Sequence, residues 1–267
     1  FLLGRRLFYD PILSADQSIS CGSCHIQAAA FTHHGHDLSH GINDLLGNRN
    51  TPAIQNLAWY NSFMWDGGIL DLDLQPIAPI TNPVEMGDTL LAVLKKLNAH
   101  PEYPALFKKA FGSNTITTSL LMKALSQFML MLVSADSKYD KVIRKEGMVF
   151  TPEEQNGYTV FKEKCGSCHK EPLFTDNSFR NNGISISLVN DKGRFLVTQN
   201  NADKYKFKVP GLRNLAYTAP YMHDGRLLTL DAVLTHYTSQ VQNTPNLDPL
   251  LQQNAILGIS LTATEKA

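Results

Sequence analysis

Apolar residues recur at helical spacing in several separate stretches of the chain. The apolar positions are Leu90, Leu91, Leu94 and Leu97; Leu120, Leu121, Ala124, Leu125, Phe128 and Leu132; and Leu230, Val233, Leu234 and Tyr237. Because this spacing places side chains on one face of a helix, each stretch predicts a helix that packs against a core. Few stretches alternate between apolar and polar residues, so we expect little strand.

Helix starts can be read at three places. Thr151 is followed by Pro152 and then by Glu154, which is the pattern of a capped helix with Pro at its first position. This helix should lead to Cys165. Thr229 can cap the last of the apolar stretches, which we expect to run to Tyr237. Residues 261–267 predict the start of a further helix.

Composition excludes some classes of protein. The 267 residues have a mass of 29.7 kDa and carry 24 basic and 24 acidic side chains, so the formal net charge is zero. A nucleic-acid binder would need a basic surface, so nucleic acid is not an expected partner. The longest apolar run, Phe128 to Val133, is far too short to span a bilayer. Small molecules and proteins remain as partners.

All four cysteines lie in two copies of the pattern C-x-x-C-H. The copies are Cys21, Cys24 and His25, and Cys165, Cys168 and His169. In this pattern both thiols can bond to the vinyl groups of one haem, and the adjacent histidine becomes an iron ligand. Disulfides, a thioredoxin-like pair and a four-cysteine zinc site are the alternatives. None of them explains a histidine at the fifth position in both copies.

The repeated motif predicts the organisation of the chain and its compartment. The two motifs begin 144 residues apart, which indicates two similar haem domains, 1–147 and 148–267. Two covalently bound haem c groups are therefore the expected cofactors. Haem of this kind is attached outside the cytoplasm, so we expect a periplasmic protein, although the chain given shows no signal peptide.

Several further segments accompany the two motifs in a fixed order. They are Leu3–Asp10, Arg49–Pro52, Trp65–Gly67, Pro79–Met86, Leu173–Asp176, Val209–Asn214 and Thr218–Gly225. In this order the chain resembles the diheme bacterial cytochrome c peroxidase superfamily, which also includes the MauG-like enzymes that oxidise proteins. The resemblance spans nearly the whole chain. We expect an all-α fold of two tandem class I cytochrome c-like domains with long loops.

The resemblance implies that the N-terminal haem reacts with peroxide. Glu85 matches the family's distal acid/base, and Gln75 matches the amide that accompanies it. Trp65 matches a tryptophan that lies between the haems and carries electrons. The alternatives are a solvated carboxylate for Glu85 and a buried aromatic for Trp65. His40, followed by Gly41, resembles a distal histidine that caps the iron in the resting state.

The C-terminal haem departs from the peroxidase pattern. His169 is its proximal ligand, and the resemblance places the sixth ligand 14 residues after His223, at Tyr237, where ordinary diheme peroxidases have Met. A phenolate favours the higher oxidation states of iron, whereas a thioether favours Fe(II), so Tyr237 should lower the potential. MauG-like enzymes use Tyr here. His236 or no side chain is the alternative ligand, and His223 is expected near the haem without ligating it.

Two further sites follow from the resemblance. Asn50 through its side chain, and Thr218 and Pro220 through their carbonyls, match a calcium site of the family. Arg213 can pair with a haem propionate through its planar guanidinium, and a structural ion pair is the alternative.

The leading hypothesis is an oxidoreductase that reduces hydrogen peroxide to water at the His25 haem. Electrons would pass Trp65 from the other haem, which a cytochrome c or a cupredoxin reduces. A MauG-like enzyme that oxidises a partner protein is one alternative, and Tyr237 favours that chemistry. A diheme electron carrier without enzymatic activity is the other alternative. We expect no membrane span, and a homodimer is a further expectation.

Overall fold

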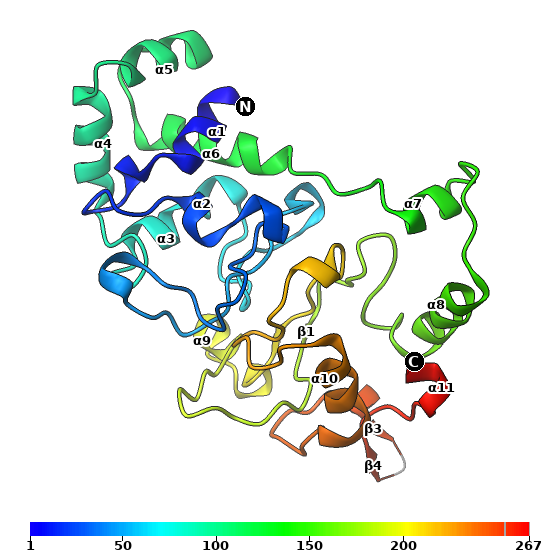
Figure 1. Ribbon diagram of the computed structural model, residues 1–267. Coiled ribbons are helices and arrows are strands. Elements are labelled where there is room, and N and C mark those ends of the chain that lie inside the picture. Colours follow the sequence, from blue (N-terminus) through cyan, green and yellow to red (C-terminus); the bar gives the residue numbers. More distant parts are fainter. Residues whose placement is uncertain (254, 267) are drawn as a thin grey trace. The chain divides into compact units, whose positions relative to one another are not determined.

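The computed structural model describes residues 1–253 and 255–266, and the chain divides into two compact units (Figure 1). Unit 1 comprises Phe1–Phe63, Ile69–Leu132 and Tyr217–Arg226, and unit 2 comprises Met64–Gly68, Val133–Ala216 and Leu227–Ala267. Each unit contains one C-x-x-C-H motif and one short segment from the opposite half of the chain. These units differ in their boundaries from the expected haem domains, 1–147 and 148–267, which stay a prediction.

Unit 1 is helical and has the larger apolar core. Its α-helices are α1 (Leu2–Tyr9), α2 (Cys21–Cys24), α3 (Ile77–Thr81), α4 (Leu90–Ala99), α5 (Tyr103–Phe111) and α6 (Thr118–Leu130). The helices predicted over 90–97 and 120–132 are thus confirmed as α4 and α6. Helix α1 packs against α6 at Gly4, where an added Cβ would lie 1.8 Å from the carbonyl oxygen of Ala124. Only glycine allows the two backbones to approach so closely.

Unit 2 has more loops and a smaller apolar cluster. Its α-helices and strands are α7 (Lys138–Ile143), α8 (Pro152–Lys164), β1 (Phe179–Arg180), α9 (Phe195–Thr198), β2 (Phe207–Lys208), α10 (Leu230–Thr235), β3 (Gln252–Gln253), β4 (Ile256–Leu257) and α11 (Ala263–Lys266). Helix α8 begins as predicted, because the Thr151 hydroxyl accepts from the Glu154 N–H and the Glu154 carboxylate accepts from the Thr151 N–H. Its buried apolar cluster contains Val241, Leu247 and Leu251.

Strand is scarce, as predicted. Strand β1 pairs with β2 in antiparallel register, and β3 pairs with β4 in the same way. Each strand has only two residues. The all-α expectation is confirmed for the part of the chain that the structure describes.

The helix predicted from Thr229 to Tyr237 changes form within this range. The α-helix ends at Thr235, and His236–Gln240 continues as a π-helix. The hydroxyls of Thr238 and Ser239 both donate to the Thr235 carbonyl, at 3.2 and 3.1 Å, and so compete with the backbone donors of an α-helix. Such widened turns occur frequently at functional sites.

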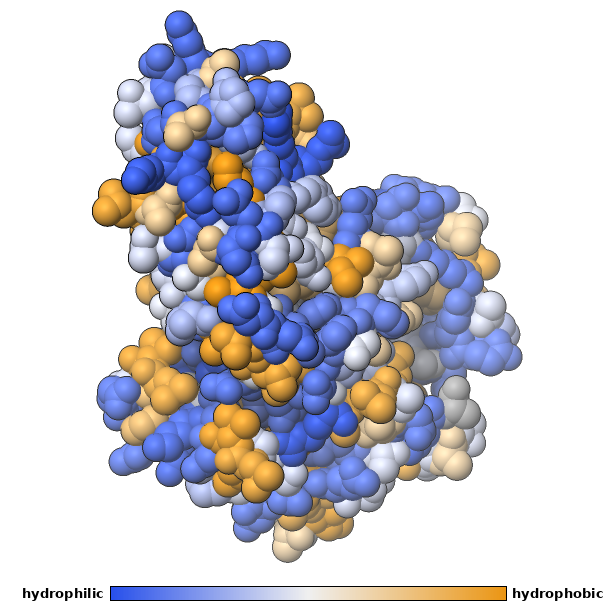
Figure 2. Space-filling model, turned by 60° about the vertical axis from the view of Figure 1, so that its left-hand side comes forward, coloured by the Kyte–Doolittle hydropathy of each residue, from blue (hydrophilic) through white to orange (hydrophobic). Residues whose placement is uncertain are grey.

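The start of a helix predicted in 261–267 is confirmed as α11, with Thr262 capping Glu265, whereas Ala267 lies outside the described residues. Figure 2 shows one face of the surface, on which apolar side chains form small separate groups among polar ones. In the described residues no helix is both long enough and apolar enough to cross a membrane.

Candidate functional site

The first C-x-x-C-H motif forms one helical turn. Residues Cys21–Cys24 are α2, so the two thiols lie three residues apart on one helix face. Ser20 and Ser23 form a reciprocal cap at the start of this turn, and His25 ends it. All four cysteines in the described chain have free thiols, so the disulfide alternative is not realised. A single turn that presents two thiols and then a histidine fits covalent haem attachment.

Both motif histidines are held in the same way. His25 Nδ1 lies 2.9 Å from the Phe31 carbonyl oxygen, and His169 Nδ1 lies 2.9 Å from that of Phe174. Because a carbonyl can only accept, each Nδ1 carries the proton and each Nε2 carries the lone pair. Phe31 and Phe174 both have positive φ, at 62° and 59°. This turn aims the carbonyl at the imidazole and prepares Nε2 to bind iron.

The cysteines and histidines of both motifs are partly buried. Burial raises the pKa of Cys21 to about 12 and that of Cys24 to about 11, and it also raises the thiol pKa of Cys165 and Cys168. Burial lowers the pKa of the motif histidines, which favours the neutral imidazole that binds metals. An apolar porphyrin therefore fits both places.

Glu85 lies beside the first motif. Its carboxylate is partly buried and accepts from Asn82 Nδ2 at 2.9 Å through Oε1. Burial raises the pKa of Glu85, and the Asn82 hydrogen bond lowers it. The charge of Glu85 also raises the pKa of the Cys24 thiol, so the two side chains are near each other.

A backbone segment at Gly41 joins Glu85 to the motif. The Cys24 thiol donates to the carbonyl of His40 at 3.3 Å, and the Ile42 N–H donates to the carbonyl of Glu85 at 2.8 Å. A Cβ on Gly41 would lie 2.2 Å from the carbonyl oxygen of Val84, so glycine is required at this crossing. Unit 1 thus brings the predicted acid/base to the predicted haem site.

The His40 side chain lies among other histidines. Its Nδ1 is 2.8 Å from Asp44 Oδ1, and its ring centroid is 4.4 Å from that of His36. Among residues 1–253 and 255–266, no group of three or more His, Cys, Asp and Glu side chains is arranged to hold a metal ion. The role of His40 as a resting-state ligand stays a prediction.

Gln75 and Trp65 fall in different units. Gln75 is partly buried and follows a short 3-10 helix of unit 1, Leu72–Leu74. Trp65 belongs to unit 2, where its carbonyl accepts from the Lys208 N–H at 2.8 Å. Arg194 Nη1 donates to the next two carbonyls, those of Asp66 and Gly67, at 2.8 and 2.9 Å. The backbone that carries Trp65 is therefore fixed at three successive residues.

Tyr237 lies at the second motif, inside the π-helix. Burial raises the pKa of its phenol, a hydrogen bond from Asn182 lowers it, and the thiols of Cys168 and Cys165 raise it. The phenol therefore lies near both thiols of this motif. His236 is buried, and its Nε2 lies 3.0 Å from the Asn182 carbonyl oxygen. This contact places the His236 proton on Nε2, and the choice between Tyr237 and His236 as the sixth ligand stays a prediction.

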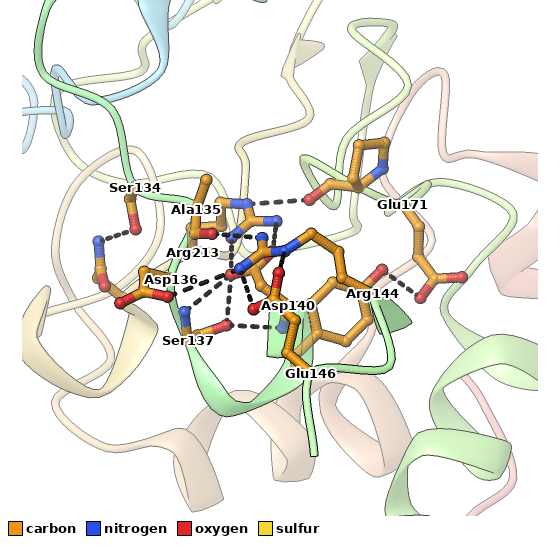
Figure 3. Close-up of polar contacts among 12 residues, drawn as sticks. Ser134, Ala135, Asp136, Ser137, Asp140, Arg144, Glu146, Glu171 and Arg213 are labelled. Carbon is orange, nitrogen blue, oxygen red and sulfur yellow. Dashed lines mark hydrogen bonds and ion pairs between the residues drawn. The ribbon is translucent and has the colours of Figure 1, made fainter. Parts of the chain in front are cut away.

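Arg213 forms a buried ion pair (Figure 3). Its two terminal nitrogens donate to both oxygens of Asp140 at 2.8 and 2.7 Å, and its Nε donates to the Pro172 carbonyl at 2.9 Å. The guanidinium holds the pKa of Asp140 well below its ordinary value. This is the structural alternative to a haem propionate, and the propionate role of Arg213 stays a prediction.

The residues predicted to bind calcium share unit 1. Asn50 Nδ2 donates to the carbonyls of His36 and Asp37, and the Asn50 N–H donates to the His223 carbonyl at 2.8 Å. Thr218 and Pro220 belong to the same unit. The His223 side chain is 9% exposed and lies 4.0 Å from Asp224, so it is buried in unit 1 and not in the unit of His169.

Sequence reasoning missed the partners of the predicted residues. These are the carbonyls of Phe31 and Phe174, the Asn82 amide at Glu85, and Asn182 at Tyr237. A signal was present for the first pair, because Phe-Thr follows each motif at nearly the same distance. Nothing local marks Asn182, which lies 55 residues before Tyr237.

The fold and the two sites define a class of protein, the diheme c-type cytochromes. A model of the di-haem cytochrome c peroxidase family matches residues 1–148. The chain is 36% identical over 248 residues to methylamine utilization protein MauG of Methylorubrum extorquens, which covers 92% of this chain and 70% of that protein. It is also 36% identical over 265 residues to the cytochrome c551 peroxidase of Nitrosomonas europaea, with coverages of 96% and 78%.

The chain belongs to the di-haem cytochrome c peroxidase family. Its fold matches a solved MauG-like protein associated with microbial copper homeostasis, with 32% identity, a TM-score of 0.89, and coverage of 100% of this chain and 85% of that one. The protein is a peroxidase with two haem c groups that takes peroxide as substrate and exchanges electrons with a redox partner. The enzyme prediction is confirmed, and the electron-carrier alternative is set aside.

Proposed function

We propose that the enzyme reduces hydrogen peroxide at the haem held by Cys21, Cys24 and His25, and that electrons reach it through the haem held by the second motif. The observation that supports this most is the position of Glu85 beside Cys24 and Gly41 in unit 1. When bound, the haem supplies an iron that binds peroxide and assists cleavage of its O–O bond. The electron donor is a small redox protein, either a cytochrome c or a cupredoxin.

Glu85 moves the proton in this proposal. Because Asn82 occupies Oε1, we assign Oε2 to take the proton from the near oxygen of peroxide and return it to the leaving oxygen. Burial favours the protonated carboxyl that this return step needs. Gln75 orients the peroxide through its amide. Trp65 carries electrons. The hydrogen bonds accepted by its own carbonyl and by those of Asp66 and Gly67 hold the backbone that carries its ring.

The test uses the ferric holoenzyme and reduced cytochrome c or cupredoxin. The proposal expects one high-spin or peroxide-reactive iron in the electron resonance spectrum, directly or after one-electron reduction, and oxidation of two donor molecules per peroxide. Two irons that never react with peroxide would overturn it.

A second candidate function is MauG-like oxidation of a partner protein. It is supported by Tyr237, which lies near both thiols of the second motif. A phenolate ligand stabilises the higher oxidation states of iron. This candidate predicts that peroxide is consumed with two-electron oxidation of side chains on a protein substrate, which mass spectrometry detects. Two-for-one oxidation of a small redox protein supports the first candidate instead.

Three finer proposals accompany the function. A calcium ion is held by the Asn50 side chain and by the carbonyls of Thr218 and Pro220, which share unit 1. Removal of calcium by a chelator should then slow turnover, and added calcium should restore it. The location is periplasmic, because covalent haem is attached outside the cytoplasm. The homodimer stays a prediction.

A further inference from the structure

Two tyrosines of unit 2 share one carboxylate oxygen. Tyr139 in α7 and Tyr158 in α8 both donate to Oε1 of Glu171, at 2.6 and 2.7 Å. Their ring centroids are 6.0 Å apart, edge to face. Both rings are partly buried, whereas Glu171 is exposed. Figure 3 shows Glu171 close to the ion pair of Arg213 and Asp140.

This group is connected to the second C-x-x-C-H motif. His169 Nδ1 donates to the Phe174 carbonyl, and the Phe174 ring lies 4.9 Å from the Tyr139 ring. A chain of contacts therefore leads from His169 through Phe174 and Tyr139 to Tyr158. All of these residues belong to unit 2. Tyrosine is the first readily oxidised side chain along this chain of contacts.

Cations lie near both phenol rings. The Arg213 guanidinium carbon is 5.8 Å from the Tyr139 centroid, and Lys162 Nζ is 4.4 Å from the Tyr158 centroid. Nearby positive charge disfavours a positively charged ring, so either tyrosine can lose an electron readily only if its proton leaves as well. Burial and the Glu171 hydrogen bond raise the pKa of Tyr158 to about 12, so the phenol holds its proton at neutral pH. The Glu171 oxygen is the base in contact with both protons.

We propose that Tyr139 and Tyr158, with Glu171 as their shared proton acceptor, form a relay that carries single electrons between the surface of unit 2 and the second haem site. The relay rests on the proposed function, because peroxide supplies the oxidant. In one step a tyrosine gives an electron to the peroxide-oxidised diheme centre and its proton to Glu171. The products are a neutral tyrosyl radical and a protonated carboxyl group.

The relay is then restored by the redox partner. A reduced one-electron donor returns an electron to the tyrosyl radical, and Glu171 returns the proton, so the relay consumes neither. Two such cycles deliver two electrons, which together with two protons from water reduce one peroxide to two water molecules. The surface at Glu171 is thus the place where the donor delivers electrons.

Conservative variants separate this role from a structural one. A structural role requires only that Glu171 joins α7 to α8 through hydrogen bonds. Glu171→Gln keeps an accepting oxygen for both phenols but cannot take a proton from them at neutral pH. Tyr139→Phe keeps the ring and loses the hydroxyl. Tyr205→Phe is the matched control, because Tyr205 lies in the same unit and donates to a neutral amide, Asn190 Oδ1, at 3.0 Å.

The experiment mixes the holoenzyme with hydrogen peroxide in the absence of a donor and freezes it for electron paramagnetic resonance. Ring-deuterated tyrosine identifies the radical by narrowing its signal. We expect a tyrosyl signal in the unsubstituted protein and in Tyr205→Phe, and at least about tenfold less of it in Tyr139→Phe and Glu171→Gln. Thermal unfolding of each variant shows whether it is folded.

A second measurement generates the oxidant by light, from a ruthenium polypyridyl complex added to the holoenzyme together with a sacrificial electron acceptor, which takes an electron from the excited complex and leaves Ru(III). It does not depend on the reaction with peroxide. If the relay operates, light produces tyrosyl radicals, and their yield falls in Glu171→Gln and not in Tyr205→Phe. Equal radical yields in all variants would overturn the relay whether or not peroxide reacts. Peroxide consumption without the Tyr139-dependent signal would overturn the relay and leave the proposed function standing, whereas failure to consume peroxide would overturn the proposed function alone.

Discussion

The two C-x-x-C-H sites have the same arrangement around the motif histidine. His25 donates to the carbonyl of Phe31 and His169 to that of Phe174, each at 2.9 Å and each from a residue with positive φ. The residues assigned to the other face of each haem differ. The first site has the partly buried carboxylate of Glu85, and the second has the phenol of Tyr237 in a π-helix. The histidine arrangement prepares Nε2 to bind iron at both sites, and in the proposed function Glu85 and Tyr237 give the two irons different tasks.

The two sites also differ in a pair of loops that have similar sequences. Residues 54–58 and 212–216 share the pattern of an apolar residue, a long polar side chain and Asn-Leu-Ala. Asn56 and Asn214 both have positive φ, at 59° and 61°, and a 3-10 helix follows each. The position before the asparagine is neutral Gln55 in one copy and Arg213 in the other. In the second copy this position forms an ion pair with a buried carboxylate, that of Asp140.

The largest effect is expected from removing the acid/base of the first site. Glu85→Gln keeps the shape of the side chain but cannot accept a proton, so kcat/KM for peroxide should fall by about 10²- to 10⁴-fold. Stopped-flow mixing with peroxide and reduced cytochrome c measures it. Glu163→Gln, an exposed position in α8, serves as the control and should leave the rate unchanged. Equal rates in Glu85→Gln and the control would remove Glu85 from its role.

The next effect concerns the stability of the second site. Arg213→Gln gives the second loop the residue of the first and leaves Asp140 buried without its cation, so the free energy of unfolding should fall by about 3 kcal/mol. Urea unfolding at pH 7 measures it. The double variant with Asp140→Asn should recover part of the loss, because no unpaired charge remains. A loss below about 1 kcal/mol would show that the pair behaves like an exposed one.

The pH dependence of this ion pair has a definite sign. Arg213 lowers the pKa of Asp140 in the folded state, so the pair stabilises the fold above the ordinary pKa of an aspartate. The stabilisation is lost as pH falls through the lowered value. The difference in stability between Arg213→Gln and the unsubstituted protein should therefore shrink in acid and persist at neutral pH.

Sequence patterns predicted what is local in this molecule. The helices around residues 90–97 and 120–132 follow from apolar spacing, and the start of α8 follows from Thr151 and Glu154, because each depends on neighbours along the chain. The C-x-x-C-H motifs predicted the haem sites for the same reason. The helix expected from Thr229 to Tyr237 is present, but the sequence pattern did not predict that it changes from an α-helix to a π-helix after Thr235.

Contacts between distant residues could not be predicted in this way. Asn182 approaches Tyr237, and Asp140 pairs with Arg213, across 55 and 73 residues of sequence. No periodicity encodes such pairs, because the chain between them sets their distance. The placement of Trp65 in unit 2 is of the same kind, since it depends on donors from Arg194 and Lys208. The family resemblance supplied the residue types at these positions without their partners.

A smaller effect is expected at the iron of the second site. Tyr237→Met replaces an anionic oxygen by a neutral thioether, which favours Fe(II), so the midpoint potential of this haem should rise by on the order of 100 mV. Potentiometric titration monitored by the visible spectrum measures both haems. The potential of the first haem should stay the same, and this serves as an internal control. If neither midpoint moves, Tyr237 is not a ligand.

The smallest effect concerns the pH profile of the first site. Burial raises the pKa of Glu85 and the hydrogen bond from Asn82 lowers it, so Asn82→Leu removes the influence that opposes burial. The pKa of Glu85 should then rise further, and the acid limb of kcat/KM should move to higher pH by up to about one unit. Asn98→Leu is a control for loss of a hydrogen-bonded amide elsewhere in unit 1, since Asn98 is exposed and bonds only backbone groups of Leu94 and Ile116 in the described contacts. If Asn82→Leu lowers the rate equally at every pH, the Asn82 amide positions Glu85 without changing its pKa. The difference between the two haem sites then depends on the Glu85 carboxylate and not on its hydrogen bond.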